Sequence, residues 1–392
     1  MSFDRLLAPR TKNISASALR ELLKVSGQPG MISLSGGYPA PDSFPVDIMD
    51  TLMDKVFEKY GTTALQYGTT EGFNPLREAL VSYVARRGIK AKMDDIYISS
   101  GSQGFLDAVG KILINKGDCV AVEAPTYLGA LQAFNAYEPQ YIRLEMDDEG
   151  VIPESVEETL KSHLIKFIYL VPTFQNPTGR TMGLERRKRI AAIIQAHDAL
   201  AVEDDPYSEL RYRGERIPTL KSLAPDHVIY ASTLSKVFAP GFRVGFYIAP
   251  ESLRTWLIRV KQGVDLNTST FTQALAAEYI ANGFLEKQIP KIVEIYRPKQ
   301  EAMLGALEAH LTGEFKWIKP DGGMFIWVIG PKGMDMEAYY HKAVEKKVAF
   351  VPGKFFFTQK GEGLETMRLN YTSPDITSIE KGVKILSEVL KA

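Results

Sequence analysis

A lysine stands among small hydroxyl and apolar residues in STLSKVFAPGFRVGF, residues 232–246. Thr233 and Ser235 precede Lys236 and Arg243 follows it, so groups that bind anions surround one amine. Most lysines lie on the surface, but the apolar VFAP that follows suits a solvated face poorly. In a partly dry pocket the pKa of a lysine falls below its usual ~10.4, and the neutral amine can attack a carbonyl carbon to form a Schiff base. These residues therefore predict that Lys236 binds a phosphorylated aldehyde.

Polar residues that suit such a ligand follow several predicted strands. In EDDPY, the carboxylate of Asp204 would keep a pyridine nitrogen protonated, and the phenol of Tyr207 would contact the ring hydroxyl. In GSQG, the backbone amides of Ser102 and Gln103 would hold a phosphate at the start of a helix. In NPTG, Asn176 could donate to the ring hydroxyl or to a substrate carboxylate. Each motif alone also fits an ordinary turn or helix cap, so their combination is what indicates a ligand site.

The motifs NPTG, DDPY, SKVFAPGFRVG and MRLNY, in this order and spacing, resemble those of the fold type I pyridoxal-phosphate enzymes, specifically the class I and II aminotransferases. The resemblance covers nearly the whole chain. It implies that Lys236 forms the Schiff base with pyridoxal phosphate, and that Lys236, Asp204 and Tyr207 are the catalytic residues. The cofactor contacts that it implies come from Tyr67, Ser102, Gln103, Tyr127, Asn176, Asp204, Tyr207, Thr233, Ser235, Lys236 and Arg243.

The same resemblance assigns substrate contacts. Arg368 in MRLNY resembles the arginine that binds the substrate α-carboxylate in a bidentate pair, together with Asn176; a salt-bridged strand arginine is the alternative. The opening ASALRELLKVSGQPGMISLSGGYPAP is similar to the α-aminoadipate and kynurenine aminotransferase branch, in which Gly37 and Tyr38 would contact the substrate. Arg20 would bind a distal carboxylate there, but it also fits the polar face of an ordinary amphipathic helix. Broad specificity is therefore expected.

The activity that the resemblance implies is amino-group transfer with ping-pong kinetics. An L-amino acid (2-aminoadipate, glutamate, aromatic or branched-chain) would give its amino group to a 2-oxo acid such as 2-oxoglutarate. Two alternatives stay open at this point, because fold and cofactor do not fix the reaction. The first is a β-lyase or decarboxylase with the same cofactor. The second is a regulator that uses an aminotransferase-like domain to sense an effector.

The elements that must position these residues are predicted from the alternation of apolar runs and helical stretches between residues 95 and 249. Such alternation predicts an α/β fold, a mostly parallel sheet between layers of helices, and the fold type I resemblance implies seven strands. Polar sequence follows nearly every run, at the edge where ligands collect. A large domain is expected over residues 46–295, and a smaller α+β domain over residues 1–45 and 296–392. Pro290 is expected to interrupt a long helix near its start.

Composition excludes several other classes. The chain has 392 residues, with 47 basic and 47 acidic side chains, so it lacks the positive field of a nucleic-acid binder. No apolar run approaches the ~20 residues of a membrane span, and the five histidines lack the spacing of metal ligands. One cysteine cannot make a disulfide framework, which fits the cytoplasm. From the resemblance alone, a homodimer is expected, in which Tyr67 and the segment 261–273 reach the partner's site.

Overall fold

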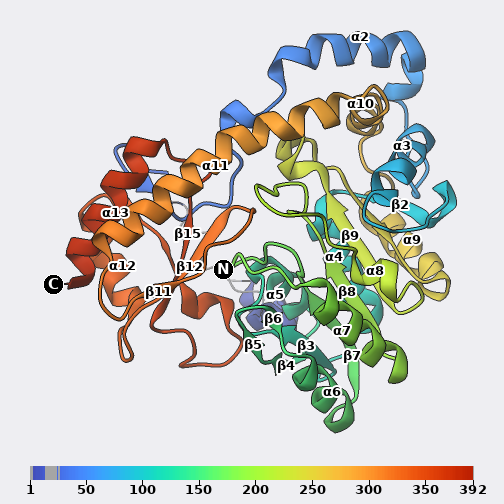
Figure 1. Ribbon diagram of the computed structural model, residues 1–392. Helices are drawn as coiled ribbons and strands as arrows, with labels where there is room; N and C mark the ends of the chain where they lie inside the picture. The colour runs from blue at the N-terminus through green and yellow to red at the C-terminus, as the bar shows by residue number, and fades with distance from the viewer. Residues whose placement is uncertain (1–2, 14–23, 25–26, 392) are drawn as a thin grey trace.

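Seven strands form one mostly parallel sheet, as predicted, in the computed structural model, which describes residues 3–13, 24 and 27–391. Across the sheet the strands are β2 (Ile96–Ser99), β10 (Gly245–Ile248), β9 (Val228–Thr233), β8 (Ala201–Asp204), β7 (Ile165–Leu170), β3 (Cys119–Glu123) and β4 (Gln140–Leu144) (Figure 1). β10 is antiparallel to β2 and β9, and the other neighbouring pairs are parallel.

Both faces of this sheet are buried. Along β7, Phe167 and Tyr169 belong to one apolar cluster, whereas Ile168 and Leu170 belong to another. Because successive side chains of a strand point to opposite faces, the two clusters lie on opposite sides of the sheet. The helices in this part of the chain are α2 (Met49–Tyr60), α3 (Asn74–Ala85), α4 (Gly101–Leu113), α5 (Leu128–Asn135), α6 (Pro153–Ser162), α7 (Leu184–Ala196), α8 (Leu220–Leu223), α9 (Glu251–Asp265) and α10 (Thr270–Ala281).

A smaller sheet of four antiparallel strands lies beside the long helix α11 (Phe284–His310) (Figure 1). Its strands, in spatial order, are β11 (Lys316–Trp317), β12 (Phe325–Ile329), β15 (Thr366–Asn370) and β14 (Val351–Pro352). The helices α12 (Met336–Glu345) and α13 (Ile376–Lys391) belong to the same part. Near the start of the chain, β1 (Ile32–Ser33) pairs in parallel with β13 (Val348–Ala349). The domain boundary expected after residue 295 falls inside α11, and the division into domains stays a prediction.

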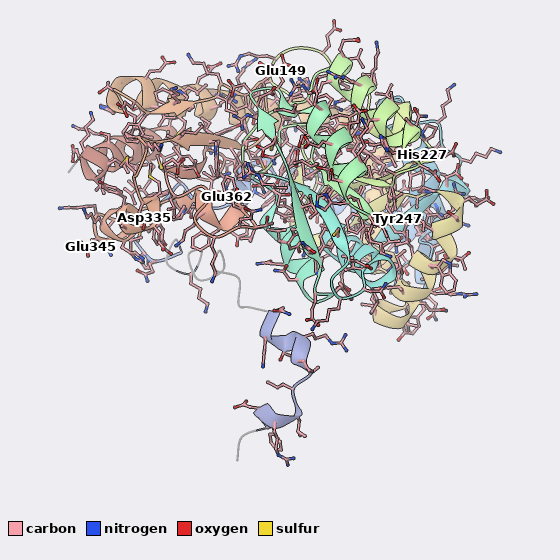
Figure 2. The ribbon with its side chains drawn as sticks, turned by 90° about the horizontal axis from the view of Figure 1, so that it is seen from below. Glu149, His227, Tyr247, Asp335, Glu345 and Glu362 are labelled. Atoms are coloured by element: carbon pink, nitrogen blue, oxygen red, sulfur yellow. The ribbon has the colours of Figure 1, made fainter. Side chains whose placement is uncertain are left out.

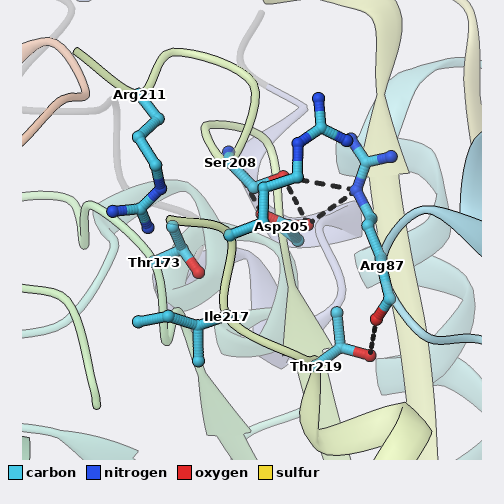
Figure 3. A pocket seen from close by; sticks show the side chains of 8 residues that line it. Arg87, Thr173, Asp205, Ser208, Arg211, Ile217 and Thr219 are labelled. Atoms are coloured by element: carbon cyan, nitrogen blue, oxygen red, sulfur yellow. Dashed lines mark hydrogen bonds and ion pairs between the residues drawn. The ribbon is translucent and has the colours of Figure 1, made fainter. Parts of the chain in front are cut away.

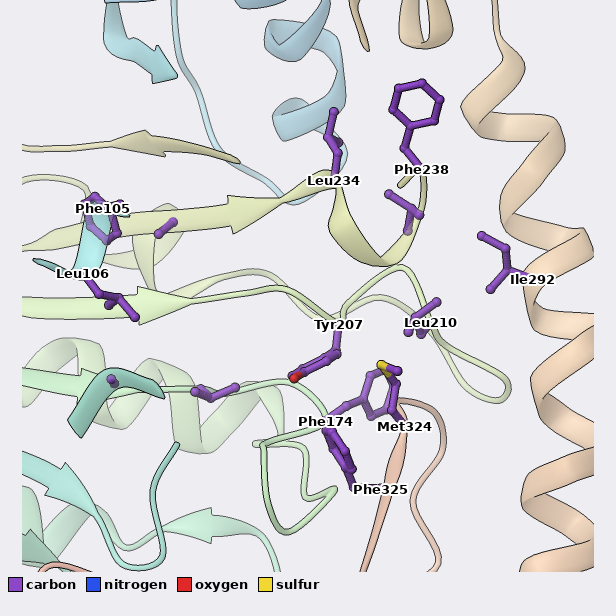
Figure 4. Close-up of a cluster of buried hydrophobic side chains, with 14 of the residues drawn as sticks. Phe105, Leu106, Phe174, Tyr207, Leu210, Leu234, Phe238, Ile292, Met324 and Phe325 are labelled. Atoms are coloured by element: carbon purple, nitrogen blue, oxygen red, sulfur yellow. The ribbon is translucent and has the colours of Figure 1, made fainter. Parts of the chain in front are cut away.

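α11 continues through Pro290 and Pro298, so the prediction that Pro290 interrupts this helix is wrong. A proline removes one backbone hydrogen bond and crowds the preceding turn. The helix is 27 residues long and buries side chains along its length, among them Ile292, Tyr296 and Met303. Packing of this face outweighs the local cost of the prolines, because most helix stability in proteins comes from tertiary contacts. Ile292 lies in the same apolar cluster as Phe105 of α4 and Phe325 of β12 (Figure 4).

α11 also fixes the loop that follows β1. The hydroxyl of Tyr296 accepts a hydrogen bond from the backbone amide of Ala40 (2.9 Å) and donates to Ser43 Oγ (3.1 Å). Gln288 Nε2 donates to the carbonyl oxygen of Ser43 at 2.9 Å. The glycine-containing stretch just before Ala40 is therefore held at one end by the helix that joins the two sheets.

Short 3-10 helices and one small hairpin complete the described structure. They are η1 (Asp4–Leu6), η2 (Pro9–Asn13), η3 (Pro41–Ser43), η4 (Val46–Ile48), η5 (Gly61–Leu65), η6 (Met93–Asp95), η7 (Leu234–Lys236), η8 (Pro240–Phe242), η9 (Gly353–Phe356), and the hairpin β5 (Met146–Asp147) with β6 (Gly150–Val151). Figure 2 shows η1 and η2 projecting away from the body of the molecule. Among the described residues, no helix is long and apolar enough to cross a membrane.

The strands that run parallel to one another end at one edge of the large sheet. Their last residues are Ser99, Glu123, Leu144, Leu170, Asp204 and Thr233. Ligands of such sheets bind outside the carboxyl ends of the strands. The polar segments singled out in the sequence therefore meet at this edge.

Gly245 provides a test of how tightly this edge is packed. A Cβ added at Gly245 would lie 2.8 Å from the carbonyl carbon of Gly101, so β10 and the start of α4 are in backbone contact. Replacing Gly245 by Ala is expected to lower the free energy of unfolding by ~1–3 kcal/mol, because the contact cannot accommodate a methyl group. The measurement is urea unfolding of the cofactor-free protein.

Gly263→Ala is the matched control for that substitution. Gly263 lies in α9, and a Cβ there meets nothing within 4 Å. Alanine at this helical position should raise the free energy of unfolding by ~0.5–1 kcal/mol. Equal destabilisation by the two substitutions would contradict the packing described at β10.

Candidate active site

A cavity of about 320 Å³ opens at the carboxyl edge of the large sheet. Thirteen of the residues predicted to bind cofactor or substrate line it: Gly37, Tyr38, Ser102, Gln103, Tyr127, Asn176, Asp204, Tyr207, Thr233, Ser235, Lys236, Arg243 and Arg368. Pro39, Val171, Pro206, Pro240 and Phe325 complete the lining. The fold thus brings together residues that lie more than 300 positions apart in the chain, from Gly37 to Arg368.

Lys236 ends η7, the short helical turn that directly follows β9. Its Nζ donates a hydrogen bond to the carbonyl oxygen of Gly37 at 3.0 Å. Burial, together with the positive charges of Arg243 and Arg368, lowers the pKa of Lys236 to about 8. The neutral form, in which an amine is a nucleophile and a base, is therefore far more abundant near neutral pH than in an ordinary lysine.

Asp204 is the last residue of β8 and is almost fully buried. Its Oδ2 accepts a hydrogen bond from the phenol of Tyr169 on β7 at 2.8 Å, and its Oδ1 has no hydrogen-bond partner among the described residues. Burial raises the pKa of Asp204 to about 7, and the hydrogen bond from Tyr169 opposes this shift. The carboxylate thus presents one unused acceptor at the cavity, suited to a protonated nitrogen.

Asn176 joins two other members of the site. Its Nδ2 donates to the phenol oxygen of Tyr207 at 3.3 Å, and its Oδ1 accepts from an Nη of Arg368 at 2.8 Å. Asn176 comes from the loop after β7 in the large sheet, whereas Arg368 lies on β15 of the smaller sheet. One amide side chain therefore fixes a phenol and a guanidinium relative to each other across the two sheets.

Arg368 is buried between two aromatic rings. Its guanidinium carbon lies 4.3 Å from the centre of the Phe325 ring and 5.0 Å from that of Phe356. The second Nη donates to the carbonyl oxygen of Ser35 at 2.7 Å, and Nε has no hydrogen-bond partner in the described part of the chain. Burial lowers the pKa of Arg368 to about 10, so the side chain is cationic at neutral pH. A buried cation with an unused donor is suited to a carboxylate ligand.

The start of α4 forms the anion-binding corner of the cavity. Ser102 and Gln103 occupy its first turn, where backbone amides have no partner within the helix. Arg243 stands beside them: a Cβ on Gly101 would lie 2.3 Å from its guanidinium. From the turn after β9, Ser235 adds a hydroxyl to the lining. Glycine at position 101, with φ of +75°, is thus required for the arginine to approach the helix end.

The neighbouring carboxylate, Asp205, points away from this cavity. It lies in a separate polar pocket, shown in Figure 3, where Arg87 and Ser208 contact it. Arg87 also forms an ion pair with Glu209 at 2.8 Å, and both side chains are buried. This network anchors the segment that follows β8 and carries Tyr207.

Sequence reasoning missed several supporting residues. Glu123, at the end of β3, accepts hydrogen bonds from the amide of Val171 (3.1 Å) and from Gln175 Nε2 (3.2 Å), which holds the loop before Asn176. Burial raises the pKa of Glu123 to about 8. The sequence does indicate a role for Tyr169, because the hydroxyl of a tyrosine within a buried strand needs a hydrogen-bond partner. For Phe325 and Phe356 no signal in the sequence separates a site residue from a core residue.

Two of the predicted residues are not among the described residues that line the cavity. Tyr67 does not line the cavity; it is 80% exposed and lies in a surface hollow with Leu65, Asn267 and Phe271. Arg20 lies outside the described residues. Tyr38 lines the mouth of the cavity but is 60% exposed, and its carbonyl oxygen accepts hydrogen bonds from the side chains of Thr372 and Ser373.

The donor set fits pyridoxal phosphate. An unpartnered, buried Asp204 Oδ1 suits the pyridine nitrogen, and the open amides of α4 with Arg243 suit the phosphate. A lysine with lowered pKa suits the aldehyde carbon. The cavity volume lies in the range of small-molecule sites, ~300–1,000 Å³.

The chain is similar to known aminotransferases along nearly its whole length. Residues 31–386 match the family model described as aminotransferase class I and II. An aromatic-amino-acid aminotransferase of Thermococcus litoralis is 44% identical, over 100% of this chain and 95% of the relative. The crystal structure of a Pyrococcus horikoshii kynurenine aminotransferase, in complex with PMP, is 45% identical with a TM-score of 0.95, covering 99% and 97% of the two chains. That of a Thermus thermophilus α-aminoadipate aminotransferase, complexed with N-(5'-phosphopyridoxyl)-L-leucine, is 38% identical with a TM-score of 0.92, covering 100% and 98%.

The lowered pKa of Lys236 can be measured without the cofactor. In cofactor-free protein, acetylation of Lys236 by acetic anhydride, followed by mass spectrometry of the peptide, should increase with pH about a midpoint near 8. Because Arg243 contributes to the shift, Arg243→Gln should move this midpoint to higher pH. A midpoint at the ~10.4 of an ordinary lysine would contradict the described environment of the amine.

Proposed function

This chain belongs to the aminotransferase class I and II family, and we propose that it moves the amino group of several L-amino acids to a 2-oxo acid. Pyridoxal-phosphate-dependent amino-group transfer is the activity of the family and of the relatives with bound cofactor. The observation that supports the assignment best is the bridge of Asn176 between Tyr207 and Arg368, which sets a phenol and a carboxylate-binding cation around the amine of Lys236.

The roles proposed at the reacting centre follow from charge and reach. Pyridoxal phosphate, when bound, supplies an aldehyde that exchanges with the substrate amine and a ring that withdraws electrons from the α-carbon. Lys236 would first hold the aldehyde; once displaced, its neutral amine would take the proton from the α-carbon and return it during transfer. Asp204 would hold the ring nitrogen in its protonated form through the unpartnered Oδ1.

The remaining lining residues orient the two ligands. Ser102, Gln103 and Ser235, with Thr233 beside them, are proposed to bind the phosphate together with Arg243. Tyr127 is proposed to stack on the ring, since it lines the same cavity as Asp204 and Lys236. Tyr207 and Asn176 would bind the ring hydroxyl. Arg368 would bind the substrate α-carboxylate, with Asn176 fixing its position.

The proposed substrates are 2-aminoadipate, glutamate, and aromatic or branched-chain amino acids, with 2-oxoglutarate as an acceptor. Of the described lining residues, Lys236, Arg243 and Arg368 are basic and Asp204 alone is acidic, so the cavity suits anionic ligands. Gly37 and the half-exposed mouth at Tyr38 leave room for side chains of different size. Similar proteins named for aromatic amino acids, kynurenine and α-aminoadipate support this range.

Absorbance spectroscopy tests the activity and the donor range together. Each amino acid is added separately to the cofactor-loaded protein, and conversion of the visible band to the pyridoxamine form is followed. A 2-oxo acid should restore the band. Release of pyruvate or carbon dioxide without any acceptor would instead indicate a lyase or a decarboxylase.

Arg368→Lys tests the proposed carboxylate contact. Lysine keeps the charge but loses the planar pair of donors, so KM for every amino donor should rise by ~10- to 100-fold. The slow reaction of an amine without an α-carboxylate should change little. Steady-state kinetics with glutamate and with such an amine measure both effects.

Arg180→Lys is the matched control for this substitution. Arg180 lies in the same loop as Asn176, between β7 and α7, but lines a different surface hollow. The KM of the Arg180→Lys variant for amino donors should stay near that of the unaltered enzyme. Equal effects of the two substitutions, or an unchanged KM in Arg368→Lys, would refute the role given to Arg368.

We also propose a homodimer with shared sites. Large apolar side chains are exposed on the face around Tyr67: Leu65 is 69% exposed, Val264 63% and Leu266 55%. Tyr67 and the segment after α9 form one hollow on this face. A second copy of the chain would cover this surface and receive Tyr67 near its phosphate corner.

Mixed dimers test whether Tyr67 acts on the partner. Inactive Lys236→Ala chains and impaired Tyr67→Ala chains are co-expressed and purified with two different tags. If Tyr67 serves the partner's site, half of the sites in each mixed dimer are intact, and the doubly purified mixed dimers should keep about half of the full activity. If Tyr67 serves its own subunit, mixing yields no activity above that of Tyr67→Ala.

The cytoplasm is the proposed location. The chain holds one cysteine, Cys119, so it cannot form a disulfide within itself. Proteins of reducing compartments generally lack such bonds. Fractionation of the producing cells tests this proposal.

A further inference from the structure

Two buried tyrosines make the same hydrogen bond to two adjacent carboxylates. Tyr169 lies on β7 and Tyr230 on β9, the strands that flank β8 on either side. Tyr169 Oη donates to Asp204 Oδ2 at 2.8 Å, and Tyr230 Oη donates to Asp205 Oδ2, also at 2.8 Å. Both phenols are fully buried.

The two carboxylates differ in what else binds them. Asp205 also contacts Arg87 and Ser208 (Figure 3), so the bond from Tyr230 is one of several. For Asp204, Tyr169 is the one side chain among the described residues that donates a hydrogen bond to the carboxylate. The other oxygen of Asp204 is left for a ligand.

The position of Tyr169 is itself well determined. Its ring packs edge-on against Phe134 of α5, with ring centres 5.9 Å apart. Burial and the nearby Asp204 keep the pKa of Tyr169 far above its usual value, so the phenol remains a donor. The hydroxyl therefore reaches the carboxylate from a rigid strand and a packed ring.

We propose that Tyr169 is a positioning residue, which holds one oxygen of Asp204 so that the other faces the cofactor ring and which favours the ionised carboxylate. The proposal rests on the proposed function, because it assumes that Asp204 meets the ring nitrogen. The hydrogen bond stabilises the anion specifically, since a phenol donates more strongly to a carboxylate than to a carboxylic acid.

The surroundings of Asp204 make this contribution necessary. Burial and the charge of Asp205 raise the pKa of Asp204, and Tyr169 opposes them. Three other titratable groups interact with Asp204, and none of them carries a positive charge: Glu123 on β3, Tyr127 before α5 and Tyr207 after β8. Without the phenol, the carboxylate would take up a proton at a higher pH and lose its fixed orientation.

Tyr169→Phe tests the proposal through cofactor affinity. The dissociation constant of pyridoxamine phosphate is measured by calorimetry against pH on cofactor-free protein, where no bond to Lys236 forms. Affinity should fall as pH falls through the pKa of Asp204. In Tyr169→Phe this fall should begin about one pH unit higher, with affinity weaker by about fivefold near pH 7 and by about tenfold well below it, because a hydrogen bond to a charge is lost.

Tyr230→Phe is the matched control. It removes the same hydroxyl from a neighbouring strand, one carboxylate along, and should leave the pH dependence of pyridoxamine phosphate binding unchanged. In an Asp204→Asn background, Tyr169→Phe should have no further effect on affinity. In steady-state kinetics, Tyr169→Phe should lower kcat more than it changes KM for the amino donor.

Equal behaviour of Tyr169→Phe and Tyr230→Phe would overturn the proposal, as would a persistent effect of Tyr169→Phe in Asp204→Asn. If Tyr169→Phe does not fold, 3-fluorotyrosine at position 169 replaces it. The fluorinated phenol is a stronger donor, so the fall in affinity should move to lower pH, and no shift would again refute the role. Failure of the proposed function is distinguishable, because amino transfer would then be absent from the unaltered protein while the binding data still test Tyr169.

Discussion

Desolvation of a few charges at one sheet edge is the constraint on which the rest of this structure depends. Lys236 is useful only if its amine is neutral near pH 7, and burial together with two neighbouring guanidinium groups lowers its pKa to about 8. The same burial would neutralise Asp204, whose pKa it raises to about 7. A base and an acid with closely matched pKa values thus share one cavity, and the hydrogen bond from Tyr169 on β7 favours the ionised form of Asp204.

Both sheets contribute side chains to the cavity. The large sheet supplies the turn of Lys236, the carboxylate of Asp204 and the open end of α4, all at the ends of parallel strands. The smaller sheet supplies Arg368 and the ring of Phe325 that packs against it. Asn176 is one of the polar links between the two parts, because it binds both Tyr207 and Arg368, so the proposed orientation of the ligand depends on how the two sheets meet.

Much of this arrangement could be predicted from residues that lie next to each other in the sequence. Lys236, Asp204, Tyr207 and Asn176 stand in short motifs directly after predicted strands, so the parallel sheet alone brings them to one edge. The partners that come from strand pairing could not be predicted, because the sequence does not say that β7 lies beside β8 and places Tyr169 against Asp204. The local propensity of proline does not predict that α11 continues through Pro290, because tertiary contacts stabilise this helix. The role proposed for Tyr67 involves a second chain, whose position the contacts within one chain do not give.

The most direct test of the account is to locate the cofactor's attachment. The cofactor-loaded protein is reduced with sodium borohydride, digested, and analysed by mass spectrometry for a phosphopyridoxyl group on lysine. The account predicts the group on Lys236, and none in Lys236→Ala treated in the same way. Modification of a different lysine in the unaltered protein, or an unmodified Lys236 in protein that has bound pyridoxal phosphate, would contradict it.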